Sequence, residues 1–549
     1  MKRLTLSVML VVAVVANTFA CTNLIVGKNV STDGSTIVSY SADSYGLFGE
    51  LYHYPAGMHK KGTLIDVHEW DTGKYLGQIE QARQTYNVIG NMNEFQLTIG
   101  ETTFGGRPEL VDTTGIIDYG SLIYLGLQRS RTAREAIKVM TDLVQEYGYY
   151  SSGESFTIAD PNEIWIMEMI GKGPGVRGAV WVAVRVPDDC ISAHANQSRI
   201  HQFDMNDKNN CMYSPDVISF AREKGYFDGV NKDFSFANAY APLDFGARRY
   251  CEARVWSYFN MFTARGNEFL PYILGDTDTP MPLFVKPNRK ISVQDVKNAM
   301  RDHYEGTPLD ISRDFGAGPY HTPYRLSPLS FKVGDKEYFN ERPISTQQSG
   351  FVFVAQMRST LPDAIGGVLW FGTDDANMTV FTPVYCCTDK VPVCYSRVDG
   401  ADYITFSWNS SFWIFTCNLQ YVKCLLHSKL HILHEFFHCI SASSRFSTSF
   451  APCFSYFFSL VTILFNCLTH CLTSLLCILI MLHAVCQLGV LHLFRVCLVK
   501  ILHKLTNLII TLIVSIHFKI LHLLFSSVLI ADHECPKHEQ TSEECPDQE

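Results

Sequence analysis

The sequence predicts an α+β domain in which helices cover antiparallel sheets. Two features support this class: paired strand patterns joined by turns, and amphipathic helical segments between them. The clearest strand pair consists of residues 163–170 (EIWIMEMI) and 179–186 (AVWVAVRV), which a glycine-rich stretch separates. Because these glycines join two strands and do not open a helix, they favour a turn over a phosphate-binding loop.

A second strand pair is predicted at residues 21–40. The segment 21–27 (CTNLIVG) has strand character, residues 30–35 (VSTDGS) supply turn chemistry, and residues 36–40 (TIVSY) resume an extended pattern. This hairpin places Cys21 at the start of its first strand.

Two segments have the apolar periodicity of amphipathic helices. Within residues 131–146, apolar residues recur at helical spacing and charged residues fill the opposite face. Residues 292–303 show a similar pattern, and Ser292 is the predicted N-cap. Both helices are expected to cover a sheet.

Length, charge and composition limit the possible functions. The 549 residues suggest two or three domains, or one large domain with an appendage. The formal net charge is −9 and the basic residues are scattered, which argues against a nucleic-acid partner. From residue 416 onward the chain holds eleven of its eighteen cysteines and twelve of its nineteen histidines, but one glycine and no tryptophan.

If Cys21 is free, the six other cysteines before residue 416 permit up to three disulfides without identifying them.

The N-terminus has the pattern of an export signal. Lys2 and Arg3 precede an apolar stretch, residues 4–15, that is short for a membrane span, and Ala20 ends a small-residue cleavage site. Cleavage after Ala20 would leave Cys21 first, in a periplasmic or extracellular protein. An ordinary signal that happens to precede a cysteine, and a lipoprotein signal, are the alternatives, and Phe19 fits the second poorly.

A mature chain that starts at Cys21 carries a thiol and an α-amine on one residue. Their unperturbed pKa values are about 8.5 and about 8, so part of the amine is free near neutral pH to take the thiol proton. The thiolate can then attack an amide carbonyl and form a thioester that water hydrolyses. Before cleavage the nitrogen belongs to an amide and cannot act as a base.

The segment 21–28 (CTNLIVGK), followed by residues 32–35 (TDGS) and Asp43, is similar to the opening of N-terminal-nucleophile cysteine dipeptidases. This family includes lactobacillar dipeptidase and the secernins, and penicillin V acylases and bile salt hydrolases are distant relatives. Further segments match in the same order: 191–200, 304–310, 342–347, 366–372 and 374–376. The resemblance extends to about Trp413. It implies a four-layer αββα sandwich, hydrolysis of dipeptides or short peptides, and no metal or other cofactor.

The resemblance also implies roles for single residues. Cys21 matches the nucleophile, and Asp43 matches the aspartate that holds its amine, with a turn or cap as the alternative role. Asn196 resembles an asparagine of the active site and oxyanion region, with a buried amide at a strand end as the alternative. Arg254 resembles the arginine near the nucleophile, and Arg249 is close enough to be the correct one instead; a surface salt bridge is the alternative for either.

Two positions depart from the distant acylases. Tyr40 stands where they have an arginine, three residues before Asp43, so that role is vacant or supplied elsewhere. Glu101 lies where they place an oxyanion asparagine. Two-residue specificity requires groups for the free amine and the carboxylate of the substrate, and Glu101 and Arg249 are the candidates.

The predicted domains are a signal peptide (1–20), a dipeptidase domain (21–415) and an anomalous apolar, Cys/His-rich extension (416–549). The composition of the extension is the one that an inverted or out-of-frame reading would produce, so we interpret it as non-native coding sequence. Alternatively, residues 454–485 and 505–530 are apolar enough for membrane helices, and membrane contact is expected only there.

Two rival functions come from this extension. His434, Glu435 and His438 have the spacing of a zinc-peptidase motif, although a tail so rich in histidine produces such spacing easily by chance. The other rival is an inactive, surface-anchored binding protein. Oligomeric state and the side-chain preference of a substrate do not follow from the sequence.

Overall fold

The computed structural model describes residues 21–44, 46–314, 316–318, 321–324, 330–339 and 341–417. All of them belong to the first of the two units into which the chain divides, Met1–His431. The predicted signal peptide, the candidate membrane segments and the motif of His434, Glu435 and His438 lie outside the described residues.

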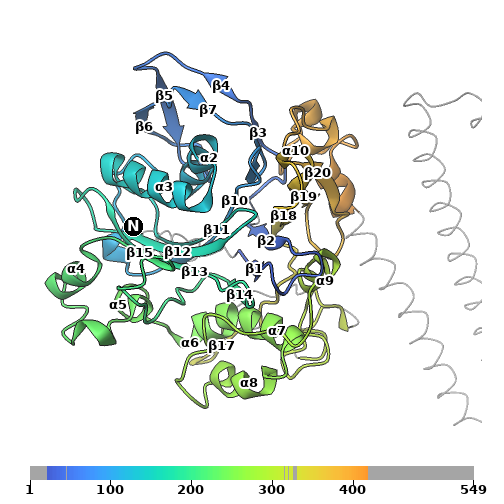
Figure 1. The fold of residues 1–549 in the computed structure, drawn as a ribbon. Helices are drawn as coiled ribbons and strands as arrows, with labels where there is room; N and C mark the ends of the chain where they lie inside the picture. Colours follow the sequence, from blue (N-terminus) through green and yellow to red (C-terminus); the bar gives the residue numbers. More distant parts are fainter. Residues whose placement is uncertain are drawn as a thin grey trace, which may run out of the picture. The chain divides into compact units, whose positions relative to one another are not determined.

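One antiparallel sheet has six strands in the order β14-β1-β2-β18-β19-β20 (Figure 1). Its strands are β1 (Asn23–Val26), β2 (Thr36–Asp43), β14 (Ile191–His194), β18 (Ser349–Met357), β19 (Val368–Thr373) and β20 (Thr382–Tyr385). The predicted opening hairpin is present, with Ile25 paired to Val38.

The other large sheet has eight strands in the order β15-β13-β12-β11-β10-β9-β8-β3. Its strands are β3 (His53–Tyr54), β8 (Val88–Ile89), β9 (Met92–Asn93), β10 (Thr98–Gly105), β11 (Gly153–Ala159), β12 (Ile164–Gly171), β13 (Ala179–Arg185) and β15 (Cys211–Tyr213). The glycine-rich stretch joins β12 to β13 with Gly171 opposite Ala179, as the sequence predicts. Three small ribbons pair β4 (Gly57–Met58) with β7 (Gln84–Thr85), β5 (Leu64–His68) with β6 (Tyr75–Glu80), and β16 (Ser330–Val333) with β17 (Lys336–Phe339).

The α-helices lie on both sides of the sheets. They are α2 (Tyr119–Arg129), α3 (Ala133–Tyr147), α4 (Val217–Glu223), α5 (Phe236–Tyr240), α6 (Phe245–Ala247), α7 (Ala253–Phe262), α8 (Gly266–Leu274), α9 (Val293–Ala299) and α10 (Asp363–Gly366). A π-helical turn, Arg248–Glu252, precedes α7, and 3-10 turns occur at Pro108–Leu110, Asn231–Asp233, Val393–Tyr395 and Val398–Gly400. Strands and helices together confirm the predicted α+β class.

Both predicted helices are present. Thr132 caps α3 by accepting a hydrogen bond from the Glu135 amide. Ser292 caps α9 in a reciprocal capping box with Asp295. However, α9 ends at Ala299, earlier than predicted, and Tyr304 has a φ of 65°, which a helix cannot accommodate. The fully buried Tyr304 donates its hydroxyl to the Arg342 carbonyl, so tertiary packing overrides the helical pattern.

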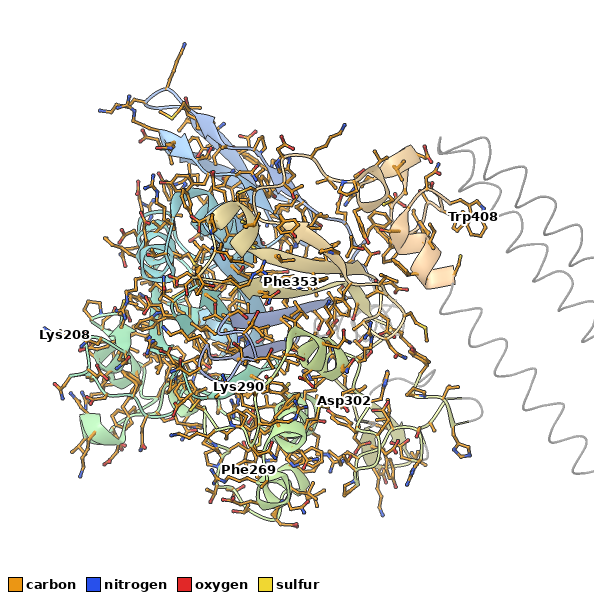
Figure 2. All side chains as sticks on the ribbon, turned by 45° about the vertical axis from the view of Figure 1, so that its right-hand side comes forward. Lys208, Phe269, Lys290, Asp302, Phe353 and Trp408 are labelled. Carbon is orange, nitrogen blue, oxygen red and sulfur yellow. The ribbon has the colours of Figure 1, made fainter. Side chains whose placement is uncertain are left out.

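Alternating side chains show which face of each strand meets which layer. Along β1, Leu24 and Val26 join a buried cluster with α7, whereas Ile25 joins the cluster between the two sheets. Along β12, Ile166 belongs to that central cluster and Met167 packs with residues of α2 and α3. Figure 1 shows α2 and α3 beside β10 to β13, and α7 and α8 beyond β14 and β1. Figure 2 shows Phe353 in the interior and Trp408 at the periphery.

One half of β10 lies open at a sheet edge. Strand β9 pairs with β10 only at Thr98, whereas β11 pairs along its whole length on the other side. The side-chain amides of Asn23 and Asn196 donate to the free carbonyls of Glu101 and Thr103, at 2.7 and 2.8 Å. The open edge of β10 is thereby joined to β1 and to the segment that follows β14.

Two negative findings apply to the described residues alone. No helix there is long and apolar enough to cross a membrane. The eight cysteines within this part of the chain, Cys417 included, are free thiols, so none of the permitted disulfides is formed.

Candidate active site

Cys21 lies two residues before the start of β1 and is 6% exposed. Thr22 pairs with Ser41, so the antiparallel register brings Cys21 to the end of β2, where Asp43 lies. The thiol sulfur is 3.8 Å from the hydroxyl of Tyr40. Burial raises the pKa of this thiol, and the carboxylates of Glu101 and Asp43 raise it further. The chain therefore holds a buried, neutral thiol beside two acids.

Asp43 is a fully buried carboxylate at the end of β2. It accepts hydrogen bonds from Arg342 at 2.6 Å, from Ser349 at 2.6 Å and from Ser41 at 3.0 Å. Burial raises the pKa of Asp43, and the Arg342 guanidinium opposes this rise. Arg342 is thus the cation beside Asp43, a position that Tyr40 does not fill.

Arg254 on α7 is completely buried and binds directly to the start of the described chain. Its guanidinium donates to the Cys21 carbonyl at 2.6 Å and to the Thr22 hydroxyl at 2.8 Å. It also donates to the Ala195 carbonyl and the Asn196 side-chain oxygen, both at 3.0 Å. Burial lowers the pKa of Arg254 to about 10, with Arg342 adding to the effect, so the guanidinium stays charged at neutral pH.

Asn196 connects Arg254 to the edge of β10. Its φ of 63° lies in the left-handed region, which asparagine tolerates better than most residues. The side-chain oxygen accepts from Arg254 while the amide nitrogen donates to the Thr103 carbonyl. In this arrangement both ends of the amide are engaged in positioning the strands.

Glu101 is brought to the thiol and Arg249 is not. The Tyr40 hydroxyl donates to the Glu101 carboxylate at 2.5 Å and also contacts the Cys21 sulfur. Tyr40 therefore links Glu101 to the thiol. Burial raises the pKa of Glu101 to about 7. Arg249, within the described residues, forms an ion pair with Glu341. Of the two candidate arginines, Arg254 is therefore the one that hydrogen-bonds to Cys21.

Three residues of this site received no role from the sequence. Arg342 stands in the matching segment 342–347, so the sequence signalled its position but not its ion pair with Asp43. Thr22, which receives Arg254, stands in the matching segment 21–28. Glu154 on β11 interacts electrostatically with Glu101, and nothing in the sequence pattern indicated it.

A small cavity with aromatic walls adjoins the thiol through Tyr40. It is lined by Tyr40, Tyr52, Tyr54, Trp70, Gly90, Asn91, Tyr119, Gly120, Ile123, Tyr124 and Phe351. The described residues contain no group of three or more side chains that could hold a metal ion.

Comparison with known proteins identifies a cysteine-type dipeptidase. The model of peptidase family C69 matches residues 20–53 and 49–430. The chain therefore belongs to peptidase family C69, a family of N-terminal-nucleophile cysteine dipeptidases.

Curated proteins with the same kind of name are similar over most of their length. A "Probable dipeptidase" of Salmonella dublin is 31% identical over 67% of this chain and 81% of its own. A "Probable dipeptidase" of Latilactobacillus sakei is 28% identical over 64% of this chain and 71% of its own. "Dipeptidase A" of Lactobacillus helveticus is 25% identical over 72% and 80%.

Replacing Arg342 with methionine tests the buried ion pair with Asp43. The Asp43 carboxylate would be left without its cation, and we expect a loss of about 3–5 kcal/mol in the free energy of unfolding. The loss should shrink as the pH falls, because Asp43 then takes up a proton. Chemical denaturation at several pH values measures both effects.

Arg397→Met is the matched control, because it removes an ion pair whose arginine side chain is 59% exposed, against 2% for Arg342, and it should cost about 0–1 kcal/mol. The double variant Asp43→Asn with Arg342→Met should recover much of the lost stability. Equal losses in Arg342→Met and Arg397→Met would contradict the account of this pair.

Proposed function

We propose that this protein is an exported dipeptidase whose mature chain begins at Cys21 and which cleaves dipeptides through a thioester on that residue. The observation that carries the proposal is the position of Cys21, held by Arg254 at the start of β1 and placed beside Asp43. The dipeptidase names of the relatives support the substrate class. The two large sheets, with helices packed on their outer sides, support the four-layer αββα sandwich of N-terminal-nucleophile hydrolases.

In the proposed reaction, the α-amine of Cys21 takes the thiol proton and the thiolate attacks the carbonyl of the first residue of the substrate. The resulting ammonium then protonates the leaving nitrogen, and the second amino acid departs. Water attacks the thioester with the amine again as base, which releases the first amino acid and restores the thiol. Hydrogen-bond donors must stabilise the oxyanion in both halves.

The charges around the thiol explain why export processing would switch the enzyme on. While Cys21 follows Ala20, its nitrogen is an amide, and burial together with Glu101 and Asp43 keeps the thiol protonated. Cleavage supplies a base at the same residue. Its protonated form is a cation that Asp43 would hold, and Arg254 fixes the carbonyl of the same residue.

For the substrate, we propose that Glu101 holds the free α-amine. Its carboxylate contacts Tyr40, whose hydroxyl also faces the thiol. Arg249 is the candidate for the substrate carboxylate, and it would have to exchange Glu341 for that group. The aromatic cavity beside Tyr40 offers an apolar surface next to the thiol.

Three forms of the enzyme test the nucleophile and the need for processing. A chain that begins at Cys21 should hydrolyse dipeptides, whereas Cys21→Ser and a chain that retains Ala20 should not. Loss of the amine base alone should slow hydrolysis at least about 100-fold. Cys190→Ser, a change at another buried cysteine, is the control and should keep its activity. Full activity in a chain shown by N-terminal sequencing to retain Ala20 would overturn the mechanism.

The pH dependence of thiol alkylation tests the electrostatic part of the proposal. The charge of Glu101 raises the pKa of Cys21, so Glu101→Gln should move the alkylation midpoint to lower pH. The rate of iodoacetamide labelling of Cys21 across pH measures this without a substrate. Glu135→Gln, on the exposed face of α3, should leave the midpoint unchanged. A midpoint that stays in place or rises in Glu101→Gln would show that Glu101 does not act on the thiol.

A further inference from the structure

Glu101 and Glu154 form a buried carboxyl pair. In the register of β10 and β11, Glu101 lies opposite Phe156 and Thr103 lies opposite Glu154. Paired residues share a face of the sheet, so the two glutamates are diagonal neighbours within reach of each other. Each is 1% exposed, and the carboxyl of each glutamate acts on the pKa of the other.

Only two of the four carboxyl oxygen atoms of the pair accept hydrogen bonds within the described residues. Tyr40 donates to Oε1 of Glu101, and Thr103 donates to Oε1 of Glu154 at 2.7 Å. The Oε2 atom of each glutamate is buried and accepts from no donor among the described residues. Two carboxylates this close cannot both stay ionised, and a single proton between them would satisfy both.

The titratable groups that face the pair, in the part of the chain that the structure describes, supply no positive charge. Burial raises the pKa of Glu154, and Glu101 and Asp71 raise it further. The other titratable groups that face the pair are the Cys21 thiol and the hydroxyls of Tyr40, Tyr119 and Tyr149. Asp43 has Arg342 as its counter-ion, whereas neither glutamate of the pair has one among the described residues.

The α-ammonium of a dipeptide is a cation that would lie close to the pair when the substrate is bound at the thiol. Its α-ammonium is bonded to the carbon next to the carbonyl that the thiolate attacks, and attack requires sulfur and carbonyl carbon to approach within about 3.5 Å. The ammonium must then lie within a few ångströms of the sulfur. Glu101 is within this range, because Tyr40 contacts both the sulfur and the Glu101 carboxylate.

We propose that the Glu101 and Glu154 carboxyls share one proton in the free enzyme and release it when the α-ammonium of a dipeptide binds between them. This inference rests on the proposed function of the Cys21 site. The exchange is balanced: the protonated pair and the ammonium give a complex of two carboxylates with one ammonium, and a proton leaves to solvent. A blocked amino terminus cannot displace the proton, so the pair selects substrates with a free one.

Calorimetry measures this proton directly. A mature chain with Cys21→Ala, which cannot hydrolyse, is titrated with L-alanyl-L-alanine near pH 6 in buffers of different ionisation enthalpy. We expect release of about one proton per site, because burial raises the pKa of Glu101 to about 7 and the pair is protonated at that pH. N-acetyl-L-alanyl-L-alanine should bind more weakly and release none.

The variant Glu154→Gln, added to Cys21→Ala, should release no proton, since the glutamine amide donates to Glu101 permanently. Glu168→Gln is the matched control: Glu168 is equally buried but accepts from Ser198 and from the Arg199 and Ile200 amides. Thermal unfolding checks that both variants fold. If Glu154→Gln does not fold, the Cys21→Ala chain alone still tests the inference. Dipeptide binding to that chain without proton release would overturn it.

Two other outcomes have distinct meanings. Equal proton release with and without Glu154→Gln would assign the proton to another group, such as the α-amine, and overturn the inference while leaving the dipeptidase mechanism intact. Absence of dipeptide binding, together with absence of hydrolysis by the chain that retains Cys21, would overturn the proposed function and this inference with it.

Discussion

The buried guanidinium of Arg254 is the interaction on which the site depends. It hydrogen-bonds to Cys21 and Thr22 at the start of the described chain and to Ala195 and Asn196 after β14. Through Asn196 the same network reaches the open edge of β10 in the other sheet. Because a guanidinium has five donors in a rigid plane, one residue can fix these segments together, which a lysine could not do. The position of Cys21, the proposed nucleophile, is thus set by tertiary contacts, although this residue lies next to a strand end.

The charges of the site are divided between two acidic groups. Asp43 is neutralised by Arg342 and supported by Ser349, so its environment is complete without substrate. Among the described residues, Glu101 and Glu154 have no such cation, and burial makes two adjacent charges costly. The two sides of the site therefore differ in charge: the Asp43 side is neutralised and the Glu101 side is not. In our proposal the amine of the enzyme lies on the side of Asp43, and the amine of the substrate lies on the side of Glu101.

Local structure was predictable wherever local chemistry determines it. The cap at Ser292 follows from a side chain that satisfies nearby backbone groups, and the turn before β13 follows from its glycines. The resemblance to dipeptidases indicated Cys21 from its place in a motif. The early end of α9 was not predictable, because the burial of Tyr304 competes with the helical pattern only in the folded chain.

The partners within the site lie far apart in sequence, which is why the sequence did not reveal them. Asp43 and Arg342 meet only because β2 and β18 pair, and Glu101 meets Glu154 only in one register of β10 and β11. The choice between Arg249 and Arg254 depends on the path of the π-helical turn into α7. Each of these contacts is a consequence of strand register or helix phase, and a one-residue shift would abolish it.

The central claim is that Cys21, as the first residue of the mature protein, carries the acyl group during turnover. Acid quenching of the working enzyme keeps the α-amine protonated and preserves a thioester for peptide mass spectrometry. We predict that the N-terminal peptide begins at Cys21 and gains the mass of the first amino acid of the dipeptide, less one water. An acyl group on another residue, or an acylated peptide in which Ala20 still precedes Cys21, would contradict the account.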